Sequence, residues 1–392
     1  MELKLKIKGD RVIWMVILIL SVFSILAVYS STGTLAYKVR SGNTGYYLIK
    51  QVILLLVGVF IIIFTHQVPY KYYSRLSQIF LFIAIPLLLV TLATGSSINE
   101  ARRWLILPGT GFTIQPSDFA KLAVIMYVAR ILSLRQDKIV EFKGAFLEII
   151  IPVILACMLI LPANLSTSVI LFVTAMSLMF VGRIPFKYLA LTVIGGLLIL
   201  TMFIGISLAL HKGGRIETWK NRIEAYISGE DTEDNFQVNR AKVAIVSGGL
   251  FGRGPGNSTQ RNYLPHPYSD FIYAIIIEEY GLIGSMLVLV CYLWLFFRTS
   301  MIVRRSKRTF GAFLAFGLSL GLVLQAMINM AVAVNLVPVT GQTLPLVSMG
   351  GSSILFTSTS LGMILSVSWG VEADQKEEAL KASSENKNAE DG

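Results

Sequence analysis

The sequence predicts an all-α integral membrane protein with about ten transmembrane helices. Hydrophobic residues make up 54% of its 392 residues and charged residues only 15%, and the mean hydropathy is +0.68. A soluble globular protein of this length needs more polar residues to cover its surface. Several apolar runs also approach or exceed the roughly 20 residues that a helix needs to cross a bilayer.

The candidate spans follow one another along a single polytopic domain, residues 1–371, in which no fixed-period repeat is found. In order, they are 12–30, 47–65, 76–94, 119–134, 146–161, 165–181, 188–210, 271–297, 310–334 and 352–371. The segments 119–134 and 146–161 are the shortest. Both cysteines fall inside spans, so the sequence indicates neither a disulfide framework nor a cysteine metal site.

The distribution of Lys and Arg predicts the orientation. Basic residues concentrate in alternate short segments, at 4–11, 71–75, 135–143, 183–187 and 298–308. The positive-inside rule therefore places both termini in the cytoplasm. The net charge of +11 is explained by this topology and by attraction to anionic headgroups, so nucleic-acid binding is not predicted.

Two polar segments remain outside the spans. The segment 211–269 is a long extracytoplasmic loop between spans 7 and 8, and its aromatic residues and helix-like stretch QVNRAKVAIVSGG indicate that it is structured and functional. Its glycine run GLFGRGPGNS lacks the Lys-Ser/Thr ending of a P-loop and is interpreted as a turn. The tail 372–392 is polar, mixed in charge and without an apolar face, which predicts a disordered cytoplasmic segment.

Three acids stand in or beside the eighth span, in YLPHPYSDFIYAIIIEEYG. Asp270 precedes the apolar run, where an N-cap or first-turn acid is stabilised by the helix dipole. Glu278 and Glu279 lie about 12 Å further along, at about 1.5 Å per residue. Acids at that depth are candidates for function or for pairing with a basic residue on a neighbouring helix.

Two further stretches carry polar groups at the membrane boundary. In RRWLILPGTGFTIQPSDFAKLA, Trp104 is typical of an interface anchor, Arg103 can grip a phosphate, and Gln115 stands at a helix start. Lys121, one turn into that helix, either meets an anionic lipid headgroup or extends to the interface. In VNLVPVTGQTLPLVSMGGSS, residues 334–353, prolines and glycines predict a re-entrant loop lining a cavity.

Together these stretches resemble the SEDS family of peptidoglycan glycosyltransferases. YLPHPYSDFIYAIIIEEYG is similar to the family's LPE-x-HTDFIF-x-x-x-x-EE-x-G, RRWLILPGTGFTIQPSDFAKL to its RW-I-x-x-G…QPSE-x-x-K, and LPLVSMGGSS to its LP-x-x-SYGGSS. The GNS of GRGPGNSTQ looks more like the division branch, FtsW, than the elongation branch, RodA. Departures include Asn164 for an Asp, Thr340 for a Lys and Met349 for a Tyr.

The resemblance implies an enzyme at the outer face of the bacterial cytoplasmic (inner) membrane. It polymerises lipid II into β-1,4-linked glycan strands and releases undecaprenyl diphosphate. The family's essential acid falls on Asp270, as general base. The substrate-binding residues so implied are Arg103, Gln115, Lys121, Arg222 and Ser348, and the supporting residues are Glu278, Glu279, Trp104 and Ser269.

One carboxylate suffices for this chemistry. The acceptor's 4-hydroxyl needs a base, whereas a diphosphate leaves without a second carboxylic acid. Cations must stabilise the departing charge, from Arg and Lys or from a divalent ion such as Mg²⁺ or Mn²⁺. The implied partners are a class B penicillin-binding protein and other divisome membrane proteins. A lipid II transporter and a non-enzymatic divisome scaffold are the alternatives.

Overall fold

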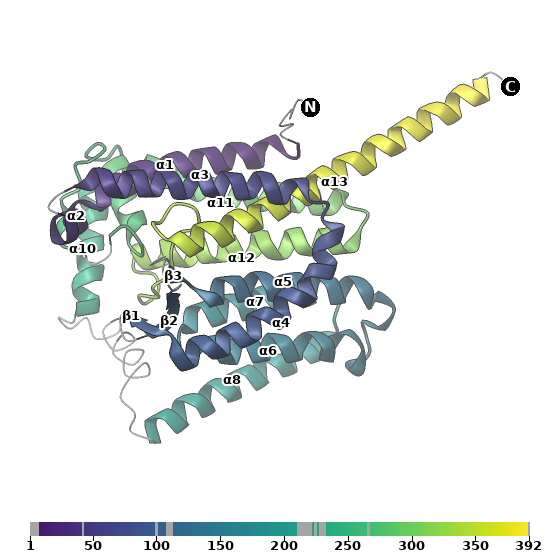
Figure 1. The fold of residues 1–392 in the computed structure, drawn as a ribbon, viewed down its shortest axis with the longest axis horizontal. Coiled ribbons are helices and arrows are strands. Elements are labelled where there is room, and N and C mark those ends of the chain that lie inside the picture. Colours follow the sequence, from purple (N-terminus) through teal and green to yellow (C-terminus); the bar gives the residue numbers. More distant parts are fainter. Residues whose placement is uncertain are drawn as a thin grey trace.

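The computed structural model describes residues 8–40, 43–98, 101–106, 113–209, 222, 226, 233–264 and 267–390. They form a helical bundle (Figure 1). Its α-helices are α1 (Arg11–Ser31), α2 (Gly33–Arg40), α3 (Thr44–Gln67), α4 (Lys71–Thr94), α5 (Pro116–Leu134), α6 (Leu147–Ile160), α7 (Leu165–Val181), α8 (Phe186–Ala209), α10 (Glu233–Gly248), α11 (Ile272–Arg305), α12 (Thr309–Ala333) and α13 (Gly351–Glu390). Single turns are η1 (Gln136–Lys138), the π-helical η2 (Phe142–Phe146) and η3 (Gln260–Asn262).

Eight of the described helices are long and apolar enough to cross a membrane. They are α1, α3, α4, η2 with α6, α8, α11, α12 and α13. The predicted span 146–161 is therefore among the long helices, because its helix extends back to Phe142. Of the other two predicted segments, α7 is a shorter apolar helix and α5 carries Asp118, Lys121 and Arg130. The protein is a multi-pass membrane protein.

The long helices run between two ends of the bundle (Figure 1). At the termini end, α1 begins, α11 ends at Arg305 and α12 begins. At the opposite end, which we call the loop end, α5, α7, α11 and α13 begin and the strands lie. Because α3 also begins there, the loop end receives the N-termini of these five helices, whose free N–H groups favour negative charge (Figure 1).

The most buried of these helices is α13, and the least buried is α8. Within their most apolar stretches, 72% of the α13 residues and 11% of the α8 residues are buried. Small residues allow α13 to approach α3 closely, since Gly58 faces Ser358 and Gly362 faces Thr65. Such contacts are typical of helix packing in lipid, where no hydrophobic force drives helices together.

The all-α prediction did not include a small sheet that lies at the loop end (Figure 1). A three-stranded antiparallel sheet, in the order β1 (Ser96–Ile98), β2 (Ala101–Ile106) and β3 (Thr113–Ile114), joins α4 to α5. In the long loop predicted at 211–269, the structure describes Arg222, Tyr226, α10 and the segment up to Leu264, and then Pro267 onward. The rest of that predicted loop, including His266, lies outside the described residues.

The structure also differs from the prediction of a disordered tail, because α13 continues through it to Glu390. Charge pairs accompany this extension. Arg308 lies 3.5 Å from Asp374, Lys307 pairs with Glu378, and Lys381 lies 2.8 Å from Glu377, one turn away on the same helix. Pairs of the last kind each stabilise a helix by about 0.2–0.5 kcal/mol.

At the termini end, the buried Asp10 joins three helices. Its carboxylate accepts hydrogen bonds from the Val12 and Ile13 amides as the N-cap of α1, and its Oδ2 lies 2.6 Å from Arg298 Nε on α11. Its own amide donates to Ser368 Oγ on α13 at 3.0 Å. One carboxylate thus sets the relative positions of α1 and α11.

Replacing Asp10 should lower stability in two steps. Asp10→Asn keeps an N-cap acceptor and loses the ion pair, whereas Asp10→Ala loses both, and the cap alone is worth about 0.5–2 kcal/mol. We expect thermal unfolding midpoints in detergent to fall in the order wild type, Asp10→Asn, Asp10→Ala. Equal midpoints for all three would show that this junction does not contribute to stability.

Candidate functional site

Three consecutive backbone carbonyls hold the stretch that carries Asp270. The Tyr268 oxygen accepts from the Met349 amide at 2.9 Å, and the Ser269 oxygen accepts from Ser348 Oγ at 2.7 Å. The Asp270 oxygen accepts from Asn329 Nδ2 at 2.9 Å. The donors come from α12 and from residues 334–350, which we call the α12–α13 loop. Asp270 is thus fixed through its backbone just before α11 begins.

The side chain of Asp270 lies beside Arg103. A methyl group placed on Gly341 would be 3.6 Å from both Asp270 Oδ2 and Arg103 Nη1, so the two groups are separated by at most twice that distance. Arg103 reaches this position from β2, with Nε donating to the Ala163 oxygen at 2.6 Å. The Ser269 hydroxyl donates to Asp270 Oδ1 at 2.7 Å. A carboxylate and a guanidinium, both partly exposed, therefore face one region.

The beginnings of α5 and α7 surround Arg103. Gln115 is the N-cap residue of α5. Its backbone N–H donates to Ser352 Oγ on α13, and its side-chain Nε2 donates to Ser117 Oγ at 2.9 Å. Asn164 is the N-cap of α7 and accepts from the Thr167 amide. Arg103, Ser117 and Asn164 line one small cavity with apolar residues of α4 and α6.

The α12–α13 loop connects these elements. Gln342 donates to Asn164 Oδ1 at 3.2 Å and to Thr167 Oγ1 at 2.9 Å, and its backbone oxygen accepts from Asn329 at 2.7 Å. Leu346 is buried and has a φ of 68°, a strained value for a residue other than glycine. The loop lies at the loop end, as the prediction of a re-entrant segment requires, and is hydrogen-bonded on several sides.

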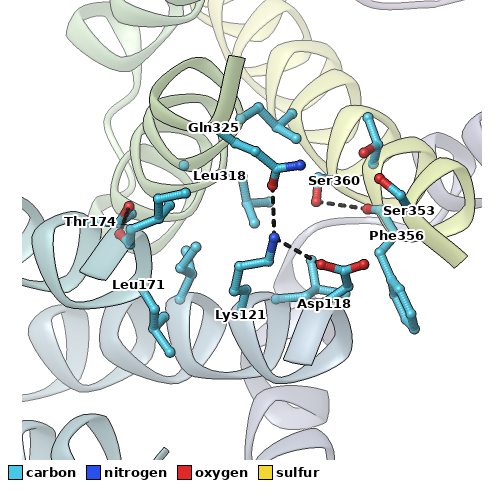
Figure 2. Close-up of a pocket in the computed structure, with 15 residues that line it drawn as sticks. Asp118, Lys121, Leu171, Thr174, Leu318, Gln325, Ser353, Phe356 and Ser360 are labelled. Atoms are coloured by element: carbon cyan, nitrogen blue, oxygen red, sulfur yellow. Dashed lines mark hydrogen bonds and ion pairs between the residues drawn. The ribbon is translucent and has the colours of Figure 1, made fainter. Parts of the chain in front are cut away.

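Of the remaining predicted substrate-binding residues, Arg222 and Ser348 contact the α12–α13 loop, whereas Lys121 lies elsewhere. Arg222 donates to the Val339 oxygen at 3.0 Å, which places it at the edge of the same loop. Ser348 is buried, accepts from the Leu344 amide and donates to Ser269, so its hydroxyl serves the loop. Lys121 bonds Asp118 and Gln325 in a separate pocket (Figure 2). Trp104, on β2 opposite Ser96, is partly buried.

Tyr268 is a neighbour that sequence reasoning did not assign to the site. Burial, and to a smaller extent the charge of Asp270, raises the pKa of its hydroxyl. The phenol therefore stays protonated at neutral pH and can act as a hydrogen-bond donor near Asp270. Its place two residues before the acid in YSD is the only signal that the sequence offers.

Glu278 and Glu279 are fully buried; both bind the 253–260 segment, and Glu279 also binds α1. Glu278 accepts from the Ser258 and Thr259 hydroxyls and from the amides of Thr259 and Gln260, with Arg253 at 3.7 Å. Glu279 accepts from the Ser258 amide and from the Ser30 hydroxyl on α1. These contacts fit the supporting role that the sequence suggested for both acids.

Residues 249–254, which lead into that segment, supply hydrogen-bond partners to backbone groups at a break in α11. Gly281 has a φ of 68° inside the helix. In an uninterrupted helix, the amides of Leu282 and Ile283 would donate to the carbonyls of Glu278 and Glu279. Instead they donate to Gly249 and Leu250, while the Glu278 and Glu279 oxygens accept from Arg253 and Gly254. All four backbone groups are thereby satisfied, as an apolar environment demands.

Glycines make this contact possible. A Cβ on Gly252 would lie 2.2 Å from the Glu279 oxygen, and one on Gly281 would lie 2.3 Å from the Leu250 oxygen. The turn predicted for GLFGRGPGNS is therefore a segment packed backbone to backbone against the EEYG break. Glycine-rich sequence paired with a distant EE-x-G is the signal that could have revealed it.

Two substitutions, Gly252→Ala and Gly256→Ala, should separate the cost of a steric clash with α11 from the cost of backbone strain at positive φ. Gly252 and Gly256 both have positive φ, of 81° and 79°, but only the Gly252 position meets backbone atoms, since nothing lies within 4 Å of a Cβ on Gly256. Gly256→Ala should cost only the conformational strain of about 1–2 kcal/mol. Gly252→Ala should lower the unfolding midpoint much further or abolish folded protein, and similar midpoints for both variants would contradict the packing described.

The site offers no protein-only metal centre. Among the residues that the structure describes, no three His, Cys, Asp or Glu side chains gather closely enough to hold an ion. Asp270 has the cation Arg103 as its neighbour instead. The described donor set therefore does not fit a resident divalent ion.

Comparisons with known proteins agree over nearly the whole chain. Residues 10–372 match the family model described as "Cell cycle protein", FtsW/RodA/SpoVE. The chain is 31% identical to the probable peptidoglycan glycosyltransferase FtsW of Trichlorobacter lovleyi, covering 92% of this chain and 93% of the relative. It is 33% identical to stage V sporulation protein E of Bacillus subtilis, covering 93% and 98%.

Solved structures share the fold. A chain from a study of "polymerization and crosslinking by a peptidoglycan synthase complex" matches with a TM-score of 0.71 and 21% identity, covering 93% of this chain and 98% of that chain. The rod shape determining protein RodA of Thermus thermophilus matches with a TM-score of 0.63 and 22% identity, covering 92% and 96%. At these identities the likeness concerns the fold.

Proposed function

The chain belongs to the FtsW/RodA/SpoVE family of cell cycle proteins, and we propose that it is a peptidoglycan glycosyltransferase that polymerises lipid II during cell division. The names of its relatives support the activity and the division branch. The observation that carries the mechanism is the convergence of Asp270 and Arg103 on Gly341. A base and a cation within reach of one substrate are what transfer from a diphosphate donor requires.

In the proposed reaction, Asp270 accepts the proton of the acceptor's 4-hydroxyl. The acceptor oxygen forms a bond to the anomeric carbon of the donor sugar, with inversion, as the bond from that carbon to the diphosphate oxygen breaks. Arg103 stabilises the charge that develops on the departing undecaprenyl diphosphate. The N-termini of α5 and α7, which flank Arg103, favour the same negative charge.

The hydroxyl of Ser269 and the phenol of Tyr268 orient the base. Ser269 donates to Asp270 Oδ1, and we assign Oδ2, the oxygen nearest Gly341, to receive the proton. Gln115 and Arg222 border the same region from α5 and from the long loop. We assign them to substrate binding, and Ser348 to holding the Ser269 backbone.

We also infer ten membrane crossings, with the loop end facing outward. The eight long helices together with α5 and α7 all run between the two ends. The termini end carries Lys71, Arg135, Lys143 and the basic run 304–308, which the positive-inside rule places in the cytoplasm. A class B penicillin-binding protein is the proposed partner, because a structure of a peptidoglycan synthase complex shares the fold.

Asp270→Asn and Asp270→Ala should abolish glycan formation from purified lipid II while leaving the unfolding midpoint nearly unchanged. Loss of a general base lowers the rate on the order of 10²–10⁴-fold. Asp374→Asn is the matched control, because it makes the same chemical change at a partly exposed acid of the termini end, and it should keep full activity. The measurement is the glycan chain-length distribution over time.

Wild-type polymerisation by either Asp270 variant would overturn the assignment of the base. The transporter alternative makes a different prediction in the same proteoliposomes, namely translocation of labelled lipid II without growth of its chain. A protein that translocates lipid II and forms no glycan, alone or with its transpeptidase, would overturn the glycosyltransferase proposal.

A further inference from the structure

Lys121 does not lie beside Asp270, although the sequence placed it with the substrate-binding residues. Its ammonium donates to Asp118 Oδ1 at 2.9 Å and to Gln325 Oε1 at 2.8 Å (Figure 2). The side chains of Lys121 and Asp118 are only 15% and 10% exposed. The lysine charge is therefore neutralised within its own pocket, between α5, α7, α12 and α13.

This contact determines how the Gln325 amide is oriented. An ammonium can only donate hydrogen bonds, so the oxygen of the amide must face Lys121. The amide nitrogen then faces the α12–α13 loop, where it donates to the Thr343 oxygen at 2.9 Å and approaches Thr343 Oγ1 at 3.4 Å. The two contacts favour the same orientation, because the Thr343 carbonyl can only accept and the Lys121 ammonium can only donate, and Lys121 holds the Gln325 side chain from the side opposite the loop.

Gln325 and Asn329 act on neighbouring peptide groups of the loop. They stand four residues apart on one face of α12. Gln325 holds the Thr343 carbonyl, and Asn329 holds the carbonyls of Gln342 and Asp270. Gly341, which lies against Arg103 and Asp270, directly precedes the two anchored residues. A hydrogen-bonded path thus runs from the intramembrane Lys121 to the wall of the candidate active site.

We propose that Lys121 is a positioning residue, which acts on catalysis by orienting Gln325 and thereby fixing the loop backbone beside Asp270 and Arg103. This inference rests on the proposed function. Positioning by the lysine and direct contact between the lysine and the substrate's diphosphate require different chemical properties at residue 121. Positioning requires a hydrogen-bond donor at residue 121, whereas binding of an anion requires the positive charge.

Two charge-neutral double variants separate these roles. Asp118→Asn with Lys121→Gln removes both charges and keeps an N–H donor near Gln325. Asp118→Asn with Lys121→Met removes the same charges and has no donor, at nearly the length of lysine. Because the buried charges are removed together, neither variant leaves an unpaired ion in the bundle.

We expect the Gln-containing variant to keep kcat for lipid II polymerisation within a few-fold of wild type. The Met-containing variant should lose kcat on the order of tenfold or more, since displaced catalytic groups are costly, with little change in KM. Equal losses in both variants with a raised KM would show that the lysine charge binds substrate. Wild-type kinetics in both would show that the path has no catalytic effect, and either result would overturn the proposal.

A second variant tests the path at its next residue. Gln325→Met is uncharged and has no N–H for Thr343, so kcat should fall as it does in the Met-containing double variant. When combined with that variant it should cause little further loss, because two changes in one path are not additive. Independent, multiplying losses would overturn the proposal. Wild type and Asp270→Asn run alongside, so inactive wild type or active Asp270→Asn would signal failure of the proposed function instead.

Discussion

The structure of the site depends on hydrogen bonds to three successive carbonyls, at Tyr268, Ser269 and Asp270. Their donors belong to Met349, Ser348 and Asn329, which are remote in sequence. A short turn before a helix cannot satisfy these carbonyls itself, and in a membrane protein water cannot be relied on to do so. The α12–α13 loop supplies these donors, and the position of the candidate base follows from the position of that loop.

The loop is in turn fixed by groups from several helices. Tyr292 of α11 donates to the Pro345 oxygen at 2.5 Å, and Ser24 of α1 donates to the Val347 oxygen at 2.9 Å. Gln325 and Asn329 hold it from α12. An irregular backbone with so many polar groups is stable at membrane depth only when each has a partner. These partners also leave Leu346 little freedom to relax from its strained φ.

Apolar length was sufficient to predict the helices, because only a helix satisfies its backbone groups in lipid. All ten predicted spans coincide with helices. The resemblance placed Asp270, Arg103 and Gln115 at one end, where the structure brings them. It could not show that Lys121 faces Gln325, because a motif gives the position of a residue along its own helix and not its partner on another helix. Nor could local sequence reveal the β1–β3 sheet or the contact of Gly252 with α11, which depend on pairing between separate segments.

The three acids of YLPHPYSDFIYAIIIEEYG differ in what surrounds them, and this difference separates their roles. Glu278 and Glu279 are 0% and 1% exposed, and their oxygens accept from the 253–260 segment and from Ser30. A general base must lie within hydrogen-bond reach of the proton it accepts, and a fully buried carboxylate gives a substrate no such access. Asp270 is partly exposed, and its Oδ2 lies near Gly341, a residue with no side chain. This difference supports Asp270, rather than the deeper pair, as the proposed base, while Glu278 and Glu279 hold the segment that leads to it.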